Sequence, residues 1–575
     1  MYLKKLQNGS DIRGIALPGK TGEQPDLSET ESKRLTLGFI HFLSEKIGKP
    51  ACSLTISIGR DPRLSGPSLK QAAVEAMRFC GVKVLDCGLA STPAMFMSTV
   101  FPEFCCDGAI MITASHLPYN RNGFKYFDKN GGLDKKDISE IISYAETYEE
   151  QTDKGLEQGI RRRSEGKYVS ERGGARAGED KCASGDRREG EDESGGDGAN
   201  SVDSKSSVDG ADLMKAYCGY IKDIIKRNVN SKTDFERPLV GLKIVVDAGN
   251  GSGGFFALDI LAPLGADISG SQFLAPDGTF PNHVPNPEDK TAMEHISAAV
   301  MKNRADLGLI FDTDVDRSAA VDKHGREISR NRIVALAAAL VAQDHPKTTI
   351  VTDSITSDQL SVFLTDKLGL LHHRFRRGYR NVINEAIRLN REGTDCQLAI
   401  ETSGHAAYKE NYFLDDGAYL AAKIVIKAAK LHSEGTIEGA AAGKPEGKPN
   451  GISEGKPDGK SEGKPDGKSL DSLISGLVES AEAGEIRLPI AAADFSAYAD
   501  GILEDLRIYA EGHPGMTVVT PNYEGVRISF DKEHGDGWCM LRKSLHDPVM
   551  PLNIESNTNG GYEKILQLLK PVLKC

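Results

Sequence analysis

Short apolar segments alternate with helical segments along most of this chain, and the alternation restricts it to a small set of folds. The apolar segments with strand composition are 53–58, 82–86, 109–113, 243–247, 307–311, 349–352 and 397–400. Helical periodicity occurs between them, at 68–80, 332–342 and 417–431. The pattern predicts βαβ units built on parallel or mixed sheets. In such sheets ligands bind beyond the carboxyl ends of the strands, so polar residues at those ends are the candidates for function.

The last part of the chain has a different pattern. Short segments at 518–520, 525–530 and 537–542 have strand composition and are bounded by Gly and Asn. An amphipathic helix is predicted at 562–573. Several strands followed by a helix indicate a smaller α+β domain at the carboxyl terminus.

Two polar inserts interrupt the pattern. Residues 151–210 are crowded with Gly, Ser and mixed charge, so they cannot bury enough apolar surface to offset their ordering entropy. Residues 441–469 repeat Glu-Gly-Lys-Pro, and their Gly and Pro content indicates a flexible linker. We expect a first domain at 1–150, a disordered insert at 151–210, a second domain at 211–325, a third at 326–432, a flexible Gly/Lys/Pro-rich linker at 433–484 and a fourth domain at 485–575.

Charge and cysteine content exclude several classes of protein. The net charge of −12 argues against nucleic acid as a partner. Ten cysteines are scattered without a Cys-x-x-Cys pair, as expected in a reducing compartment. The amino terminus lacks the apolar core of a secretory signal, and no segment reaches the length of about 18 apolar residues that a membrane span needs. We expect a cytoplasmic protein without a membrane partner, and the oligomeric state stays open.

An acidic loop follows one of the predicted strands. Asp312, Asp314 and Asp316 in FDTDVDR come directly after 307–311, and carboxylates at this spacing can converge on a hard cation such as Mg²⁺. The same letters begin an EF-hand, but that loop needs Gly where Arg317 stands, so we reject it. The alternative is a solvated acidic turn, which would concentrate charge after a buried strand without a partner. The loop therefore predicts a metal site.

A second polar loop follows the strand predicted at 109–113. In TASHLP, Ser115 lies where a hydroxyl can serve as a phosphate carrier or a nucleophile. His116 and Lys125 bring cationic or proton-transferring groups into the same segment. Ser and Thr are ordinary residues in such turns, and no Gly-x-Ser-x-Gly elbow frames this one. The loop alone does not decide between these interpretations.

Two further loops have groups suited to a sugar phosphate. A carboxylate, a hydroxyl and an imidazole, which can hydrogen-bond to a polyol, occur in ETSGH as Glu401, Ser403 and His405. A guanidinium and small donors, as a phosphate or carboxylate site requires, occur near the carboxyl terminus as Arg542, Ser544 and His546. A simple turn and an ordinary surface arginine are the respective alternatives.

A glycine-rich loop offers a different interpretation. Residues 249–254 match the Gly-x-Gly-x-x-Gly dinucleotide fingerprint, and Asp267 follows at about the distance of a ribose ligand. The same glycines suit a tight strand-to-helix turn, which is the interpretation we prefer. No Walker A sequence occurs, which disfavours a direct ATP-driven phosphotransferase.

Nine motifs in order resemble those of the α-D-phosphohexomutase family. They are SDIRG (10–14), GRDPRLSG (59–66), TASHLP (113–118), NGFKYF (122–127), DAGNGSGG (247–254), DTDVDR (312–317), RRGYR (376–380), ETSGH (401–405) and the Arg-x-Ser loop that starts at 542. The resemblance covers nearly the whole chain except the two polar inserts. In that family the glycine loop is a turn that binds no dinucleotide.

The resemblance implies a fold and a set of roles. It implies a four-domain, heart-shaped molecule with three similar mixed α/β domains, a C-terminal α+β domain and an active site in the cleft between all four. Ser115 is then the phosphoserine, and its phosphate binds Mg²⁺ together with Asp312, Asp314 and Asp316. The groups around the transferring phosphoryl are Arg13, His116, Lys125 and Arg317, of which His116 and Lys125 move protons. The substrate-binding groups are Glu401, Ser403 and His405 for the ring hydroxyls, Arg542, Ser544 and His546 for the non-reacting phosphate, and Arg380.

The implied activity is a phosphohexomutase that interconverts the 1-phosphate and 6-phosphate of glucose and/or mannose. It would use a phosphoserine enzyme, and hexose 1,6-bisphosphate as intermediate and activator. Three residues depart from the family pattern: Thr313 replaces Gly, so that the backbone there must avoid positive φ, His546 replaces Thr, and Arg380 stands where Lys is common. The alternatives are a phosphoglucosamine mutase, a non-catalytic sugar-phosphate sensor on the same scaffold, and the dinucleotide-dependent oxidoreductase.

Overall fold

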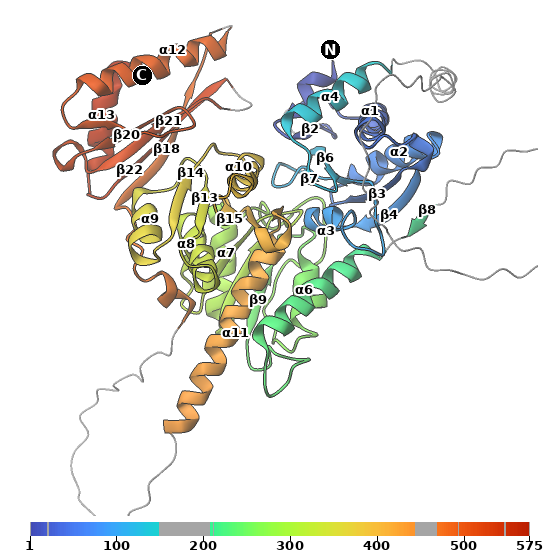
Figure 1. Ribbon diagram of the computed structural model, residues 1–575, viewed down its shortest axis with the longest axis horizontal. Helices are drawn as coiled ribbons and strands as arrows, with labels where there is room; N and C mark the ends of the chain where they lie inside the picture. Colours follow the sequence, from blue (N-terminus) through green and yellow to red (C-terminus); the bar gives the residue numbers. More distant parts are fainter. Residues whose placement is uncertain are drawn as a thin grey trace, which may run out of the picture.

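The computed structural model describes residues 2–19, 22–148, 208–210, 212–442, 469–492, 494–544 and 548–573. The insert predicted at 151–210, apart from 208–210, lies outside these ranges, and so do 443–468 and His546. The described residues form four domains in chain order, coloured blue, green, yellow to orange, and red in Figure 1. The first and fourth domains form the upper ends of an arch, and the second and third form its base.

The first domain is built on a mixed sheet. Its elements are η1 (Leu3–Leu6), β1 (Gln7–Asn8), β2 (Asp11–Ile15), α1 (Glu29–Ile47), η2 (Ala51–Ser53), β3 (Thr55–Arg60), α2 (Gly66–Phe79), β4 (Lys83–Leu89), α3 (Thr92–Met97), β5 (Gly108–Ile112), β6 (Arg121–Asp128), β7 (Gly131–Gly132), α4 (Lys135–Glu146) and β8 (Val208–Gly210). The strand order is β1-β2-β6-β5-β3-β4-β8, and β7 pairs with β6. Strands β4, β3 and β5 run parallel, whereas β6 runs antiparallel to β5 and β2. The carboxyl end of β5 therefore delivers the serine loop to the edge of the sheet.

The second domain has a smaller sheet of order β12-β11-β10-β9. Its elements are α6 (Leu213–Val229), β9 (Ile244–Asp247), the π-helix η3 (Phe256–Leu261), α7 (Lys290–Asn303), β10 (Leu307–Phe311), β11 (Ser318–Asp322) and β12 (Glu327–Ile328). Strands β9 and β10 are parallel, and β10 and β11 are antiparallel. The acidic loop is thus the short connection between two buried strands.

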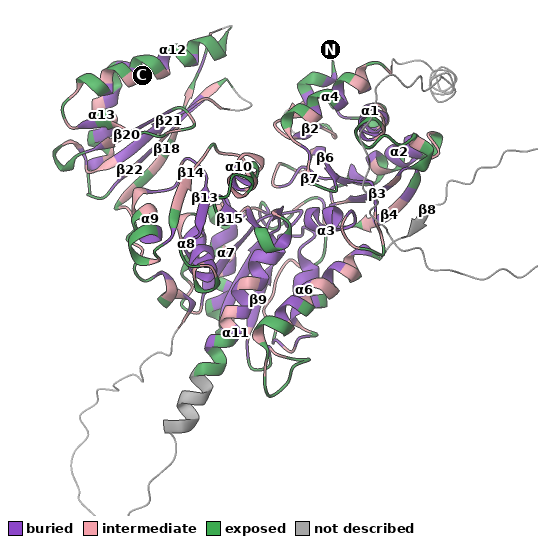
Figure 2. Ribbon diagram, in the orientation of Figure 1, coloured by how far each residue is buried: buried purple, intermediate pink, exposed green. Residues whose placement is uncertain are grey.

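The third domain repeats this arrangement and shares a core with the second. Its elements are α8 (Asn331–Asp344), β13 (Thr349–Thr352), α9 (Asp358–Val362), η4 (Phe363–Lys367), β14 (Leu371–Arg374), α10 (Tyr379–Arg391), β15 (Cys396–Ile400), β16 (Ala406–Tyr408), η5 (Lys409–Asn411), β17 (Leu414–Asp415) and α11 (Gly417–Ala442). The order is β14-β13-β15-β16-β17. Apolar residues of α11, α6, β9 and β15 belong to one buried cluster, which Figure 2 shows in purple at the centre of the molecule. The two domains therefore present their loops from a common base.

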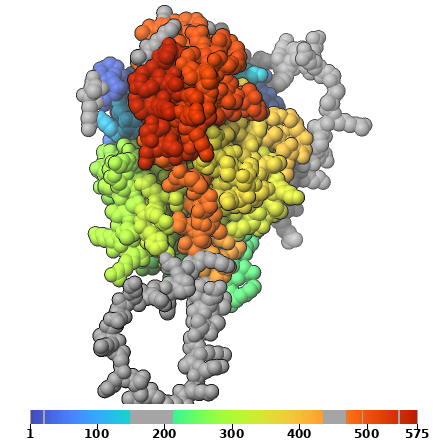
Figure 3. Space-filling model, turned by 90° about the vertical axis from the view of Figure 1, so that its left-hand side faces the viewer, coloured from blue at the N-terminus to red at the C-terminus, as the bar shows by residue number. Residues whose placement is uncertain are grey.

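The fourth domain is an antiparallel sheet covered by two helices. Its elements are β18 (Glu482–Pro489), α12 (Phe495–Gly512), β19 (Met516–Val518), β20 (Val526–Phe530), η7 (Lys532–His534), β21 (Gly537–Leu541), β22 (Val549–Ser556) and α13 (Gly561–Leu573). The order is β18-β22-β21-β20-β19, and every pair in it is antiparallel. It has its own apolar core and lies above the second and third domains in Figure 3.

The predicted fold class is confirmed, with differences in the carboxyl-terminal third. Strands predicted at 307–311 and 349–352 coincide with β10 and β13. Three elements of this third, β18, α12 and β22, were not predicted from the sequence. Side chains of β18 alternate between half-buried and exposed, so it lacks the apolar run by which the other strands were found.

The linker predicted at 433–484 also contains described structure. The 3-10 helix η6 (Leu470–Ile474) buries Leu470 and Ile474 in the core of the second and third domains. Strand β18 begins at the end of the same segment. Leu473 and Leu477 pack against the same core, so apolar side chains dock this part of the segment. None of the described helices is long and apolar enough to cross a membrane.

Candidate active site

The loop that holds Ser115 follows β5 in a strained conformation. Ser115 is 5% exposed, and its backbone is left-handed with φ of 49°. Its amide donates to Thr113 Oγ1 at 2.9 Å. A left-handed φ is unfavourable for a residue other than glycine, so neighbouring contacts must hold it. In this conformation the Ser115 hydroxyl donates to Asp312 Oδ2 of the second domain at 2.7 Å.

The acidic loop between β10 and β11 faces this serine. Asp312, Asp314 and Asp316 are completely buried, and each offers a carboxylate oxygen within 4.8 Å of the others. Among the described residues, Asp314 Oδ1 and Asp316 Oδ1 have no hydrogen-bond partner. Buried carboxylate oxygens without partners are unfavourable, and a hard divalent cation is the ligand that satisfies them. The acidic triad therefore fits a metal ion, as the sequence predicts.

Arg317 connects the serine to the acidic triad. Its Nη2 donates to Ser115 Oγ at 2.9 Å, to Asp312 Oδ2 at 3.0 Å and to His116 Nδ1 at 2.7 Å. Nδ1 of His116 accepts here, so its proton is on Nε2 when the ring is neutral. The arrangement places a fixed positive charge directly beside the serine hydroxyl.

Two more cations border the triad. Lys125 contacts Asp316 and lies 3.4 Å from Asp314 Oδ2. Arg13 pairs with Asp11 Oδ2 at 2.7 Å and also donates to a carbonyl of the serine loop. The four residues predicted to surround the phosphoryl group are therefore brought to one place.

Charge and burial shift the pKa values of these groups. The charge of Arg317, followed by burial, lowers the pKa of His116 well below its usual value. Burial acts to lower the pKa of Lys125, but Asp314 and Asp316 outweigh it and leave that pKa well above the usual value. At neutral pH His116 is therefore a neutral acceptor, and Lys125 stays charged.

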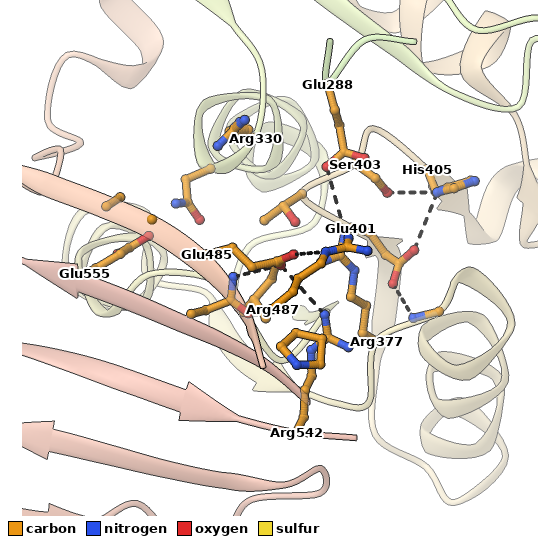
Figure 4. A pocket seen from close by; sticks show the side chains of 18 of the residues that line it. Glu288, Arg330, Arg377, Glu401, Ser403, His405, Glu485, Arg487, Arg542 and Glu555 are labelled. Atoms are coloured by element: carbon orange, nitrogen blue, oxygen red, sulfur yellow. Dashed lines mark hydrogen bonds and ion pairs between the residues drawn. The ribbon is translucent and has the colours of Figure 1, made fainter. Parts of the chain in front are cut away.

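A cavity of about 650 Å³ lies in front of the serine loop. Residues of all four domains line it, and Figure 4 shows side chains of the third and fourth domains converging on it. His116 and Arg317 line the cavity at the serine end. Because Arg317 also bonds Ser115, the serine lies directly behind this wall.

The ETSGH loop lines the middle of the cavity. His405 Nδ1 lies 2.8 Å from Ser403 Oγ and 3.5 Å from Glu401 Oε2. Glu401 also accepts a hydrogen bond from the Gly378 amide at 2.6 Å. His405 Nε2 lies 3.7 Å from Asp316 Oδ1, so this loop reaches the acidic triad. A carboxylate, a hydroxyl and an imidazole are thus presented together, as a polyol ligand requires.

The far end of the cavity is lined by the fourth domain. Arg542 is buried, and its Nη2 lies 4.0 Å from Glu485 Oε2. The other carboxylate oxygen of Glu485, Oε1, pairs with Arg487 Nε at 3.0 Å. Among the described residues, Arg542 Nε has no hydrogen-bond partner. Ser544 lines the same end, and the predicted contribution of His546 lies outside the described residues. A buried guanidinium with an unused donor is suited to bind an anion.

The arginine that RRGYR contributes to the cavity is Arg377. Its Nη2 lies 3.8 Å from Glu288 Oε1, and both residues line the cavity. Arg380, which the sequence analysis selected, donates to Asn384 Oδ1 at 3.1 Å and is not among the described lining residues. Since α10 begins at Tyr379, Arg380 belongs to the helix instead of the loop. Of these two arginines, Arg377 lines the cavity and Arg380 does not.

Two other residues near the site were missed by the sequence analysis. The Tyr379 hydroxyl donates to Asp11 Oδ1 at 3.0 Å, and its ring is stacked on that of His405 with centroids 5.4 Å apart. Asp353 follows β13 and accepts from the Thr402 hydroxyl at 2.8 Å. The position of Asp353 after an apolar strand was a usable signal, and Tyr379 lies within the RRGYR motif.

The glycine-rich segment 249–254 forms a turn that packs on the acidic loop. The Ser252 amide donates to the Thr313 carbonyl at 2.7 Å. A Cβ on Gly251 would lie 2.8 Å from Thr313 Cα, which is closer than any real contact allows. This close approach supports the turn over the dinucleotide interpretation.

The fold and site define a phosphohexomutase, an isomerase that acts as an intramolecular phosphotransferase. Residues 4–152, 218–325 and 329–439 match domains I, II and III, each described as phosphoglucomutase/phosphomannomutase, alpha/beta/alpha. The chain belongs to the phosphoglucomutase/phosphomannomutase family.

Individual relatives are distant but cover nearly the whole chain. A phosphoglucomutase of Neisseria gonorrhoeae is 25% identical and covers 98% of this chain and 95% of its own length. A phosphomannomutase/phosphoglucomutase of Pseudomonas aeruginosa is 25% identical, with 98% of both chains covered. A crystal structure of a phosphoglucomutase/phosphomannomutase family protein from Burkholderia thailandensis has a TM-score of 0.68 at 22% identity, covering 100% of this chain and 98% of that one. The last comparison supports the fold.

Proposed function

We propose that this enzyme interconverts hexose 1-phosphate and hexose 6-phosphate, of glucose and/or mannose, through a phosphoserine at Ser115. The supporting observation is the Ser115 hydroxyl, 2.7 Å from Asp312 Oδ2 and 2.9 Å from Arg317 Nη2 behind one end of the cavity. Phosphoryl transfer depends mainly on positioning and on neutralising charge. Here Asp312 positions the hydroxyl, and Arg317 supplies a positive charge beside it. Glucose and mannose are favoured over glucosamine because the relatives that cover most of the chain are named for the first two.

The reaction has two half-reactions, in which a phosphoryl group passes first from Ser115 to the sugar and then from the sugar to Ser115. In the first, the bond between Ser115 Oγ and phosphorus breaks, and phosphorus bonds to the free hydroxyl oxygen of the hexose phosphate. We assign His116 to accept the proton of that hydroxyl and Lys125 to donate a proton to Ser115 Oγ; the reverse transfers in the second half-reaction restore both groups. The product is a hexose 1,6-bisphosphate. In the second half-reaction its other phosphoryl group returns to Ser115, and added bisphosphate acts as activator by the same step.

The proposed metal is Mg²⁺. Asp312, Asp314 and Asp316 would hold it, together with the phosphate on Ser115. Such an ion, when bound, neutralises negative charge on the transferring phosphoryl group. Burial of the triad keeps water away, which limits hydrolysis of the phosphoserine.

The substrate is held at its other end by the fourth domain. Arg542 and Ser544 are proposed to bind the non-reacting phosphate, together with Arg377 of the third domain and the predicted His546. Glu401, Ser403 and His405 are proposed to bind the ring hydroxyls. The two half-reactions require the sugar to bind in two orientations. A fixed phosphate site at one end of the cavity, with groups that bind ring hydroxyls in its middle, can accept both orientations.

The test is a coupled assay with Mg²⁺ and a catalytic amount of hexose 1,6-bisphosphate. Glucose 1-phosphate and mannose 1-phosphate are compared on wild type, Ser115→Ala and the control Ser139→Ala, which changes an exposed serine on α4. We expect turnover in wild type and the control, and loss of at least about 1,000-fold in Ser115→Ala. Substantial turnover in Ser115→Ala contradicts the proposal. Binding without turnover in every protein would support the sensor.

A further inference from the structure

The motif GRDPRLSG contains a buried arginine that has no part in the reaction as described. Arg63 is 0% exposed. Its guanidinium donates to three carbonyl oxygens of the serine loop, those of Ser115, of Leu117 at 2.6 Å and of Pro118 at 2.7 Å, and to the carbonyl of Arg121 at the start of β6 at 3.1 Å. One side chain therefore ties together the whole loop that carries the reactive hydroxyl.

The guanidinium is held in turn by Asp61. This carboxylate accepts from Arg63 Nε at 3.1 Å, from the Arg63 amide at 3.0 Å and from Thr113 Oγ1 at 2.7 Å. Thr113 Oγ1 accepts from the Ser115 amide at 2.9 Å. Asp61 thus reaches Ser115 by two routes, through Arg63 to its carbonyl and through Thr113 to its amide. The buried charge of Arg63 is fully paired, as burial requires.

The second domain closes over the other side of Arg63. Gly278 forms a bridge with Arg63, and a Cβ on Gly278 would lie 2.3 Å from the Pro62 carbonyl. The ring of Phe280 lies against the guanidinium, with its centroid 5.1 Å from Arg63 Cζ. The turn at 61–64 is therefore fixed between the serine loop and the domain that provides the acidic triad.

The contacts of Asp61 and Arg63 support an unfavourable backbone conformation at Ser115. Ser115 needs a left-handed φ of 49° for its hydroxyl to meet Asp312 at 2.7 Å. That conformation costs free energy, so without support the loop would relax and the hydroxyl would move. Holding both the amide and the carbonyl of Ser115 fixes its backbone at the required angle.

We propose that Arg63 is a positioning residue for phosphoryl transfer, which holds the serine loop so that Ser115 Oγ stays beside Asp312 and Arg317. The inference rests on the proposed role of Ser115. Arg63 touches neither the cavity nor the far phosphate site, so it affects the transfer step and leaves sugar-phosphate binding unchanged. Lysine cannot replace it, because a single ammonium group cannot reach carbonyls in the fork geometry of a guanidinium.

The test compares Arg63→Lys with Arg78→Lys, a matched change of an exposed arginine on α2. We expect Arg63→Lys to lower kcat about 100-fold while KM for glucose 1-phosphate stays within about threefold, since small displacements of reacting groups have effects of this size. Glucose 6-phosphate affinity, measured by calorimetry, should be unchanged. In Arg63→Ala, millimolar methylguanidinium should restore part of kcat. Arg78→Lys should match wild type throughout.

Several outcomes would overturn the inference. A folded Arg63→Lys variant with near wild-type kcat overturns it, and so does a loss that lies entirely in KM. Where both Arg63 variants fail to fold, Phe280→Ala decides, because it removes only the ring that covers the guanidinium. We expect a severalfold lower kcat at unchanged KM there, and an unchanged kcat overturns the inference. Failure of the proposed function is distinct, because it appears as an active Ser115→Ala or an inactive wild type.

Discussion

The Asp353 carboxylate accepts a hydrogen bond from the Thr402 hydroxyl at 2.8 Å, directly behind the ETSGH loop of the cavity. Both residues follow neighbouring parallel strands, β13 and β15, so the pair is a consequence of the sheet order. Burial, followed by the negative charge of Glu401, raises the pKa of Asp353 to about 7. The loop that is proposed to bind the sugar therefore rests on a carboxylate that titrates near neutrality.

This pKa predicts a pH dependence of stability. The folded pKa lies above the unfolded value of 3.8, so the folded state binds more protons between these values. The stability that protonation contributes is fully present below about pH 4 and is lost as pH rises through about 7. Asp353→Asn cannot ionise, so it should lose less stability over this range.

The measurement is urea unfolding of wild type and Asp353→Asn at pH 5 and pH 7.5. One pKa unit corresponds to about 1.4 kcal/mol, so we expect wild type to lose at least about 1 kcal/mol more than the variant between the two pH values. Asp344→Asn, an exposed change at the end of α8, is the control. Equal pH dependence in wild type and Asp353→Asn would contradict the assigned pKa.

The acidic triad predicts metal-dependent activity. Removal of divalent cations should abolish turnover, and Mg²⁺ should restore it, because Asp314 Oδ1 and Asp316 Oδ1 have no hydrogen-bond partner among the described residues. Asp314→Asn should weaken Mn²⁺ binding at least about 10-fold, measured directly by electron paramagnetic resonance. Asp344→Asn should bind Mn²⁺ as wild type does. Tight binding by Asp314→Asn would mean that the ion lies elsewhere.

The position of Arg542 at the far end of the cavity predicts that it affects substrate binding more than the phosphoryl-transfer step. Arg542→Ala removes a buried guanidinium from the proposed phosphate site, so KM for glucose 1-phosphate should rise at least about 10-fold, with a smaller change in kcat. Its neighbour Lys543 pairs with Asp500 and is not among the described lining residues, which makes Lys543→Ala the matched control. Steady-state kinetics with both variants decides the point. A large fall in kcat at unchanged KM in Arg542→Ala would assign it a different role.

Much of the fold and the chemical centre could be predicted from sequence. Strand β10 has five buried apolar residues in succession, so both its position and the acidic loop after it were evident. The same holds for β5 and Ser115. The strands β5 and β10 belong to sheets of different domains, so the contact between their two loops was implied by the family resemblance and not by the order of strands in one sheet.

Features that depend on backbone angles could not be predicted. Thr313 avoids positive φ, as its β-branched side chain predicts, but the left-handed residue of the acidic loop is Val315, with φ of 67°. The choice between Arg377 and Arg380 depends on the residue at which α10 begins, and helix ends are poorly determined by composition. Arg63 reads as an ordinary surface arginine until its carbonyl partners are known.

The last prediction concerns the contact between the third and fourth domains. Arg527 of β20 is buried and donates to the carbonyl oxygens of Ser354 at 2.9 Å and Thr356 at 3.1 Å, and to Asp358 Oδ1 at 2.9 Å. Its guanidinium lies 3.7 Å from the ring centroid of Trp538, the single tryptophan of the chain. Trp538 also lines the cavity, so it reports on this contact and on ligands.

Replacing Arg527 should loosen the fourth domain without unfolding it, because that domain has its own core. Arg527→Met leaves two carbonyl groups of the third domain without their donor, which should cost about 1–3 kcal/mol in urea unfolding. The emission of Trp538 should shift to longer wavelength, and acrylamide should quench it more strongly, since the ring loses the guanidinium that covers it. KM should rise because Arg542 and Ser544, the proposed phosphate contacts, belong to the same domain. Arg507→Met, which changes a partly exposed arginine on α12, should alter none of these quantities. Unchanged emission and KM in Arg527→Met would mean that the fourth domain is held by other contacts.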